Sequence, residues 1–254
     1  MRFEKIVPTE QLQPYIKHYI ISENIQEKHY TVFPVSGLVI GFQYQGRLSS
    51  IANNTTVWLS SSGITGISDH HKVFKSSAHI GTILVYFTEI GFCHFTANPA
   101  HELFNQSISL DYIFEKSKVT ETEEKLAAAK TDKQRIQIVE QFFLSQTKQV
   151  EIDRLIVEAV KMIYDSKGSI RIRDLHKRLL ISESPFEKRF RKWVGTSPKK
   201  FASIVRFHTV LASLNGTKSL ADICYENNFF DQAHFTKSFK QYTGDTPENF
   251  NRFL

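Results

Sequence analysis

The feature that most constrains this chain is an internal repeat near its C-terminus. Residues 49 positions apart match in type, and the matches fall on aromatic, basic, glycine and proline positions. A repeat of this kind indicates that one supersecondary unit is used twice. The matching pairs are Phe186 and Phe235, Lys188 and Lys237, Phe190 and Phe239, Arg191 and Lys240, Gly195 and Gly244, Ser197 and Thr246, Pro198 and Pro247, and Phe201 and Phe250.

The first copy of the repeat has the pattern of a helix-turn-helix. A short amphipathic helix starting near Arg173 is followed by a turn at Leu180-Ile181. Ser182 is a good N-cap for the next helix, because its hydroxyl can accept from a free backbone N–H. Gly195 then ends that helix, and Pro198 begins another, as these residue types commonly do.

The second copy follows the same plan. Leu220 and Ile223 belong to its first helix, and Asn228 occupies the turn, where a left-handed backbone is usual and Asn is tolerated. Asp231 caps its second helix. A helix over Pro198–Leu214 joins the two copies, so the sequence predicts two helix-turn-helix units on one connector.

The outward faces of the two capped helices are candidate DNA contacts. Phenylalanines four residues apart mark the inward faces, so the polar residues opposite them face solvent. Arg and Lys donate to guanine or phosphate, Gln pairs with adenine, and Glu accepts from cytosine. Two such helices on a rigid connector would enter successive major-groove segments about 34 Å apart. The candidates are Ser184, Glu187, Lys188 and Arg191 in the first unit, and Gln232, His234, Thr236, Lys237 and Lys240 in the second.

Length and charge divide the chain in two. A chain of 254 residues is long for one core and suggests two domains. Residues 1–150 carry 14 Lys and Arg against 14 Asp and Glu, whereas residues 151–254 carry 18 against 12, which is the whole net charge of +6. The boundary is therefore predicted near residue 150, and the basic part is expected to bind a polyanion.

The N-terminal part is β-rich in pattern. Strands are predicted over Tyr30–Phe33, Gly37–Tyr44, Thr56–Leu59 and His79–Phe87, which favours a small barrel or sandwich. Six apolar residues either line a pocket or fill the barrel, and filling is the simpler expectation. Those six are Phe33, Ile40, Phe42, Trp58, Leu84 and Tyr86.

Helical segments follow the strands. Short helices are predicted at roughly Thr88–Phe95 and Pro99–Gln106, and a longer helical stretch over 118–149 has a break and a new N-cap at Thr131. Its apolar residues belong either to a dimer seam or to packing on the same chain's barrel, and the sequence leaves both open. They are Ile136, Val139, Phe143 and Leu144.

The sequence gives little support for a metal site or a catalytic site. Asp69, His70, His71 and His79 match no metal-ligand spacing, and no nucleotide-binding or hydrolase motif is present. No enzyme activity, cofactor or metal is therefore expected. The two cysteines, at positions 93 and 224, stand in apolar contexts and are predicted to be buried thiols in a reducing cytoplasm. No apolar run is long enough for a membrane span.

Over about residues 152–254 the sequence resembles the AraC/XylS family of bacterial transcription regulators. Four departures are a cysteine at 224 where the family usually has alanine, Asn228 where it has glycine, Lys188 for a frequent arginine, and the small pair Ser184-Pro185 where relatives often have larger residues. The last two suggest that the first unit contributes less base readout than the second. The matching residues are Ser182, Phe186, Lys188, Phe190, Arg191, Gly195, Ser197-Pro198, Phe201, Arg206-Phe207, Leu214, Asp222-Ile223-Cys224, Asn228-Phe229, Asp231, His234-Phe235, Lys237, Phe239-Lys240, Gly244, Thr246-Pro247 and Phe250.

The resemblance implies the remaining expectations. We expect an α+β protein with two domains. Residues 1–150 would form a cupin-like β-barrel that senses a signal or dimerises, and residues 151–254 would form an all-α DNA-binding domain. The segments Ala97–Phe104 and Ser107–Asp111 are similar to an N-terminal domain type attached to such units. Double-stranded DNA and RNA polymerase are the implied partners. Whether the N-terminal domain binds a small-molecule effector or serves only homodimerisation or protein contacts stays open, as do the operator and the sign of regulation.

Overall fold

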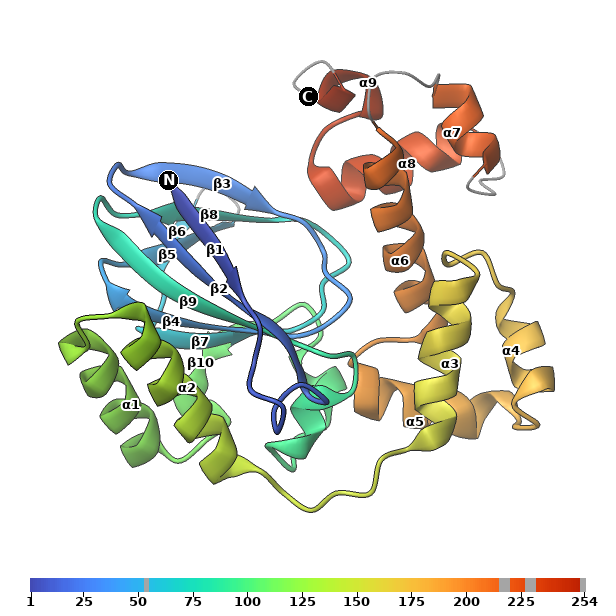
Figure 1. The fold of residues 1–254 in the computed structure, drawn as a ribbon. Helices are drawn as coiled ribbons and strands as arrows, with labels where there is room; N and C mark the ends of the chain where they lie inside the picture. The colour runs from blue at the N-terminus through green and yellow to red at the C-terminus, as the bar shows by residue number, and fades with distance from the viewer. Residues whose placement is uncertain (53–54, 215–219, 227–231, 252–254) are drawn as a thin grey trace.

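The computed structural model describes residues 1–52, 55–214, 220–226 and 232–251. The N-terminal part contains two antiparallel sheets, and the elements described from residue 154 onward are all helices (Figure 1). The six-stranded sheet has the order β1-β2-β9-β4-β7-β10, and the four-stranded sheet has the order β3-β8-β5-β6. The strands are β1 Arg2–Ile6, β2 Ile16–Asn24, β3 Lys28–Val32, β4 Val39–Gln45, β5 Leu48–Ala52, β6 Thr55–Trp58, β7 Ser62–Thr65, β8 Lys72–Ser76, β9 Ile80–Phe87 and β10 Ser107–Ser109.

The four predicted strands are confirmed as β3, β4, β6 and β9. The two helical pieces predicted between the strands and residue 110 are confirmed, as short 3-10 helices at Gly91–His94 and Ala100–Leu103. A third 3-10 turn covers Leu110–Tyr112. These turns are too short for an amphipathic helix, and their apolar residues are buried by packing against the sheet instead.

The two faces of the six-stranded sheet have different partners. In β4, Ile40 and Phe42 point to one face, where the Phe42 ring lies 5.9 Å from the ring of Phe142 in α2. Val39, Gly41 and Gln43 point to the other face and line a cavity between the sheets. The alternation follows from the two-residue period of a strand. Helices α1 (Lys116–Ala128) and α2 (Asp132–Gln146) cover the first face.

Helix α2 begins where the sequence predicted. The Thr131 side chain accepts from the backbone N–H of Gln134, and the Gln134 side chain accepts from the backbone N–H of Thr131. These two hydrogen bonds form a capping box. Ile136, Val139 and Phe143 are buried in the chain's own core, whereas Leu144 is 41% exposed. The first three residues therefore pack on their own barrel, which leaves them no part in a dimer seam.

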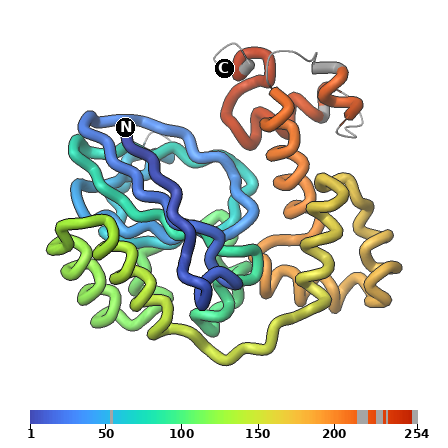
Figure 2. The backbone as a smooth tube through the Cα atoms, viewed as in Figure 1, coloured from blue at the N-terminus to red at the C-terminus, as the bar shows by residue number. Residues whose placement is uncertain are grey.

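The helical part contains two helix-turn-helix units, α4-α5 and α7-α8, joined by α6 (Figure 2). Gly195 and Gly244 both have left-handed backbones, with φ of 97° and 86°, which explains why glycine recurs at this position. The helices are α3 Arg154–Asp165, α4 Ile172–Arg178, α5 Glu183–Val194, α6 Pro198–Ser213, α7 Leu220–Glu226, α8 Gln232–Thr243 and α9 Pro247–Asn251.

The predicted caps are partly confirmed. Ser182 is the N-cap of α5 by position, but its side chain makes no capping hydrogen bond. A cap that the sequence analysis did not predict is Ser197, whose hydroxyl accepts from the backbone N–H of Lys200 at the start of α6, at 3.3 Å. Pro198 stands in the first turn of α6 as expected. The predicted turn at Asn228 and cap at Asp231 lie outside the described residues.

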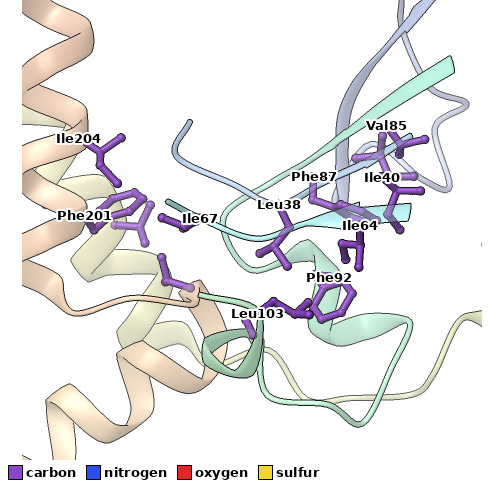
Figure 3. Packing of buried hydrophobic residues seen from close by; sticks show 14 of the residues in the cluster. Leu38, Ile40, Ile64, Ile67, Val85, Phe87, Phe92, Leu103, Phe201 and Ile204 are labelled. Carbon is purple, nitrogen blue, oxygen red and sulfur yellow. The ribbon is translucent and has the colours of Figure 1, made fainter. Parts of the chain in front are cut away.

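The two parts share one hydrophobic core. Buried side chains continue from the β-rich part, at Ile67 and Leu103, to Phe201 and Ile204 of α6 (Figure 3). Both cysteines are buried, as predicted, and the Cys93 thiol donates to the backbone carbonyl of Lys192 at 3.4 Å. Within the described residues, no helix has the length and apolar character needed to cross a membrane.

Candidate nucleic-acid interface

The orientation of α5 is set by its aromatic face. Phe186 and Phe190 are 0% exposed, and their ring centroids lie 5.7 Å apart. Ser184, Lys188 and Arg191 stand on the opposite side of the helix and are exposed. These three candidates therefore present one hydroxyl and two cations to solvent, as the sequence predicted.

Glu187 is half-buried and pairs with Arg191 one turn later. The Arg191 guanidinium donates to Glu187 Oε1 through Nε at 2.9 Å and Nη2 at 2.7 Å. An exposed pair with this spacing contributes at most about 0.5 kcal/mol. A phosphate can therefore displace the carboxylate at little cost, and Arg191 remains available to DNA.

Helix α8 repeats this arrangement. Phe235 and Phe239 are buried, while Lys237 and Lys240 are exposed at the positions equivalent to Lys188 and Arg191. Of the other candidates on α8, Gln232 is exposed, Thr236 is half-buried, and the side chain of His234 lies outside the described residues.

One exposed position of α8 was missed by sequence reasoning. Ala233 is exposed at the position equivalent to Ser184, 49 residues earlier. The alanine side chain makes no hydrogen bond, so a search for polar DNA contacts does not select it. Its methyl group nevertheless suits contact with the thymine methyl. The repeat offset alone would have identified it.

A basic group on α4 was also missed. Arg171, Arg173, Lys177 and Arg178 are exposed on or beside α4, the first helix of the first unit. In helix-turn-helix proteins this helix crosses the DNA backbone while the second enters the groove. The density of basic residues between 171 and 178 was the available signal.

A cavity of about 540 Å³ lies between the two sheets of the β-rich part. The expectation that apolar side chains fill this space is wrong for Phe33, Trp58, Leu84 and Tyr86, which line it, whereas Ile40 and Phe42 face the helices. The choice of face depends on where α1 and α2 pack. Both sheets contribute to the lining, with Val39, Gly41 and Leu84 from one and Tyr30, Trp58, Lys72 and Phe74 from the other.

Lys72 brings a cation to the wall of this cavity. Its Nζ donates to the carbonyls of Asn105 and Gln106 at 3.3 and 3.0 Å and to the hydroxyl of Ser107 at 2.8 Å. Of the carboxylates in the described chain, none comes within ion-pair distance of this nitrogen. Burial lowers the pKa of the Lys72 ammonium to about 8.

The histidines considered as ligands do not converge on one point. His70 Nδ1 lies 3.1 Å from the Asp69 carboxylate, while the neighbouring His71 contacts the helical part and His79 stands in the turn before β9. Across the described ranges, no group of three His, Cys, Asp or Glu side chains is placed to hold a metal ion.

Comparison with known proteins finds matches in two separate segments of the chain. Residues 175–252 match the model of a helix-turn-helix domain, and residues 4–109 match a domain of unknown function (DUF6597). The Msm operon regulatory protein of Streptococcus mutans serotype c is 30% identical over 165 residues, which is 63% of this chain and 58% of that protein. The chain thus matches little more than half the length of this relative.

A solved structure shows the same fold. The 1.65 Å structure of ToxT from Vibrio cholerae superposes with a TM-score of 0.50 and 11% identity, over 93% of this chain and 98% of that one. The fold and the repeated unit thus define a two-part helix-turn-helix protein with a β-rich N-terminal part. Residues 175–252 therefore form a helix-turn-helix domain, and the comparisons agree with the resemblance of this part of the chain to AraC/XylS transcription regulators.

Proposed function

We propose that this chain is a sequence-specific regulator of transcription that binds double-stranded DNA with α5 and α8 in successive major-groove segments. The observation that carries the proposal is the pair of equivalent exposed faces on the two helices, Ser184, Lys188 and Arg191 on one and Ala233, Lys237 and Lys240 on the other.

Helix α6 provides the spacing between the two units. Its 16 residues span about 24 Å, which is of the order of one DNA turn of about 34 Å. In this proposal residues 151–254 bind DNA and residues 1–150 sense a signal. RNA polymerase and a second copy of the chain remain the partners that the AraC/XylS resemblance implies.

The second unit is proposed to read bases more strongly than the first. Lys237→Ala is expected to reduce discrimination between a selected duplex and a scrambled one by about ten- to a hundredfold, since a base contact of this type contributes about 1–3 kcal/mol. Lys188→Ala is expected to have a smaller effect. Competition binding of the full chain measures both, with Lys118→Ala on α1 as the control. Full discrimination by Lys237→Ala would contradict the assignment.

We further propose that the cavity between the sheets binds a small effector with an apolar body and one anionic group. Aromatic and aliphatic side chains supply most of the lining, which suits an apolar body. The Lys72 ammonium donates to three oxygen acceptors, but it has no carboxylate partner among the described residues. An anion placed beside it would therefore gain an ion pair in a low-dielectric site. This cavity favours a sensing role over a purely dimerising one.

The charge of Lys72 makes effector binding depend on pH. An anion requires the protonated lysine, and the pKa of about 8 means that the cation is lost as pH rises. The affinity for 1-anilinonaphthalene-8-sulfonate (ANS), whose sulfonate stays ionised, is therefore expected to fall about tenfold between pH 7 and pH 9. Fluorescence titration measures this affinity.

Two controls accompany the titration. The neutral analogue N-phenyl-1-naphthylamine is expected to bind equally well at both pH values, because it does not need the cation. Lys72→Met should bind ANS weakly and without pH dependence. A tenfold fall that persists in Lys72→Met would assign the titration to another group.

A further inference from the structure

The wall of the cavity is also the contact between the β-rich part and the second helix-turn-helix unit. Within the segment Ser68–Lys72, the side chains of Ser68, His70 and Lys72 line the cavity. The two residues between them, Asp69 and His71, contact the helical part. Five consecutive residues thus have a cavity side and a helix side.

The helix side of the segment reaches both α6 and α8. The Asp69 carboxylate forms an ion pair with Lys200, in the first turn of α6. Gln241 Nε2 donates to the carbonyl of Asp69 at 2.8 Å, and the backbone N–H of His71 donates to the carbonyl of Gln241 at 3.4 Å. Gln241 lies one turn after Lys237 on α8, so the segment contacts the same helix that is proposed to read DNA.

The His71 ring adds packing to these hydrogen bonds. A Cβ atom built on Gly244 would lie 3.0 Å from this ring, so the ring rests directly on the glycine that ends α8. The segment therefore contacts α8 at its last turn and at its C-cap, which leaves little freedom for one to move without the other.

Asn105 forms hydrogen bonds with residues on both sides of the segment. Its Oδ1 accepts from the backbone N–H of Asp69 and its Nδ2 donates to Asp69 Oδ1, both at 3.0 Å, while its carbonyl accepts from Lys72. Burial raises the pKa of Asp69, but hydrogen bonds from Lys200, His70 and Asn105 outweigh it and lower the pKa to about 2. Asp69 is therefore ionised at neutral pH, and a displacement of Lys72 is transmitted to it through one shared residue.

We propose that the Ser68–Lys72 segment couples occupancy of the cavity to the position of α8, so that the effector regulates the second DNA-reading helix through this contact. The inference rests on the proposed function, because it assumes that the cavity binds a ligand. Coupling of this kind is reciprocal: if a ligand in the cavity changes the contact with α8, a change in the contact must alter the affinity of the cavity by the same factor.

The reciprocal effect can be measured without knowing the natural ligand. Lys200→Ala and Gln241→Ala change only the helix side of the contact, and neither residue lines the cavity. Each is expected to weaken ANS binding to the full chain by about threefold or more, because the loosened segment must be ordered again when the probe binds. Lys199→Ala, the adjacent exposed lysine of α6, is the matched control and should bind ANS as the wild type does.

A second measurement reads the coupling in the other direction. Saturating ANS is expected to change amide hydrogen exchange in the last turn of α8 in the wild type, and to change it much less in the Lys200→Ala/Gln241→Ala double variant. Circular dichroism confirms that each variant is folded.

The outcomes separate the two levels of the proposal. Wild-type affinity for ANS in both contact variants, with no exchange response in α8, would overturn the coupling and leave the effector site and the DNA-binding function standing. If the wild type binds no ANS, or if the wild type and Lys72→Met bind ANS with equal affinity, the proposed effector site is wrong and the coupling falls with it. The proposal that the chain binds DNA would be unaffected.

Discussion

Replacing Lys188, Arg191, Lys237 and Lys240 together by alanine is expected to lower the affinity of the full chain for duplex DNA by about a thousandfold. All four side chains are exposed on the faces opposite the buried phenylalanines. If each loses a charged contact of at least about 1 kcal/mol, the combined loss reaches three orders of magnitude. The slope of log affinity against log salt should also become less steep by about 3 to 4, since each phosphate contact contributes about 0.9.

The chain offers a control with the same change in charge. Lys116, Lys118, Lys125 and Lys130 are exposed on or next to α1, in the β-rich part, and their replacement by alanine also removes four positive charges. This variant is expected to bind DNA nearly as the wild type does. Equal losses in the two variants would show that net charge alone governs binding, and would contradict the assignment of the two faces.

Phe190→Ala is expected to destabilise the protein by about 3–5 kcal/mol. The side chain is completely buried, and its ring lies 5.7 Å from that of Phe186 and 5.6 Å from that of Phe201 in α6. Truncation removes apolar burial and leaves a cavity between α5 and α6 that the neighbouring rings can only partly fill. Urea denaturation followed by circular dichroism measures the change in the free energy of unfolding.

Phe3→Ala provides the comparison for this prediction. Phe3 is 60% exposed on β1, so its truncation is expected to change the free energy of unfolding by less than about 0.5 kcal/mol. A loss below about 1 kcal/mol in Phe190→Ala would mean that α5 is not held against α6 by this ring, and the orientation of the DNA-reading face would then need revision.

The sequence predicted best what depends on local periodicity. The 49-residue repeat located both helix-turn-helix units, and the positive φ of Gly195 and Gly244 explains why the repeat preserves these two glycines. Buried phenylalanines gave the orientation of α5 and α8 because residues four apart share one face of a helix. The exposed candidates on these helices follow from that orientation.

Features that depend on distant contacts could not be predicted in the same way. Alternation along β4 separates two faces, but only the packing of α2 decides that Phe42 faces the helices and Gln43 faces the cavity. The ion pair between Asp69 and Lys200 joins residues 131 positions apart, and no local sequence pattern predicts it. The link between the cavity and α8 therefore became visible only in three dimensions.

Binding of the full chain to duplexes selected from a random pool, followed as a function of salt, tests the central claim most directly. Two reading helices on one connector should select a motif in two parts whose centres lie about 10 base pairs apart, with an affinity that falls steeply as salt increases. A selected pool with no two-part motif, and with binding that is weak and indifferent to sequence, would contradict the claim that α5 and α8 both read DNA.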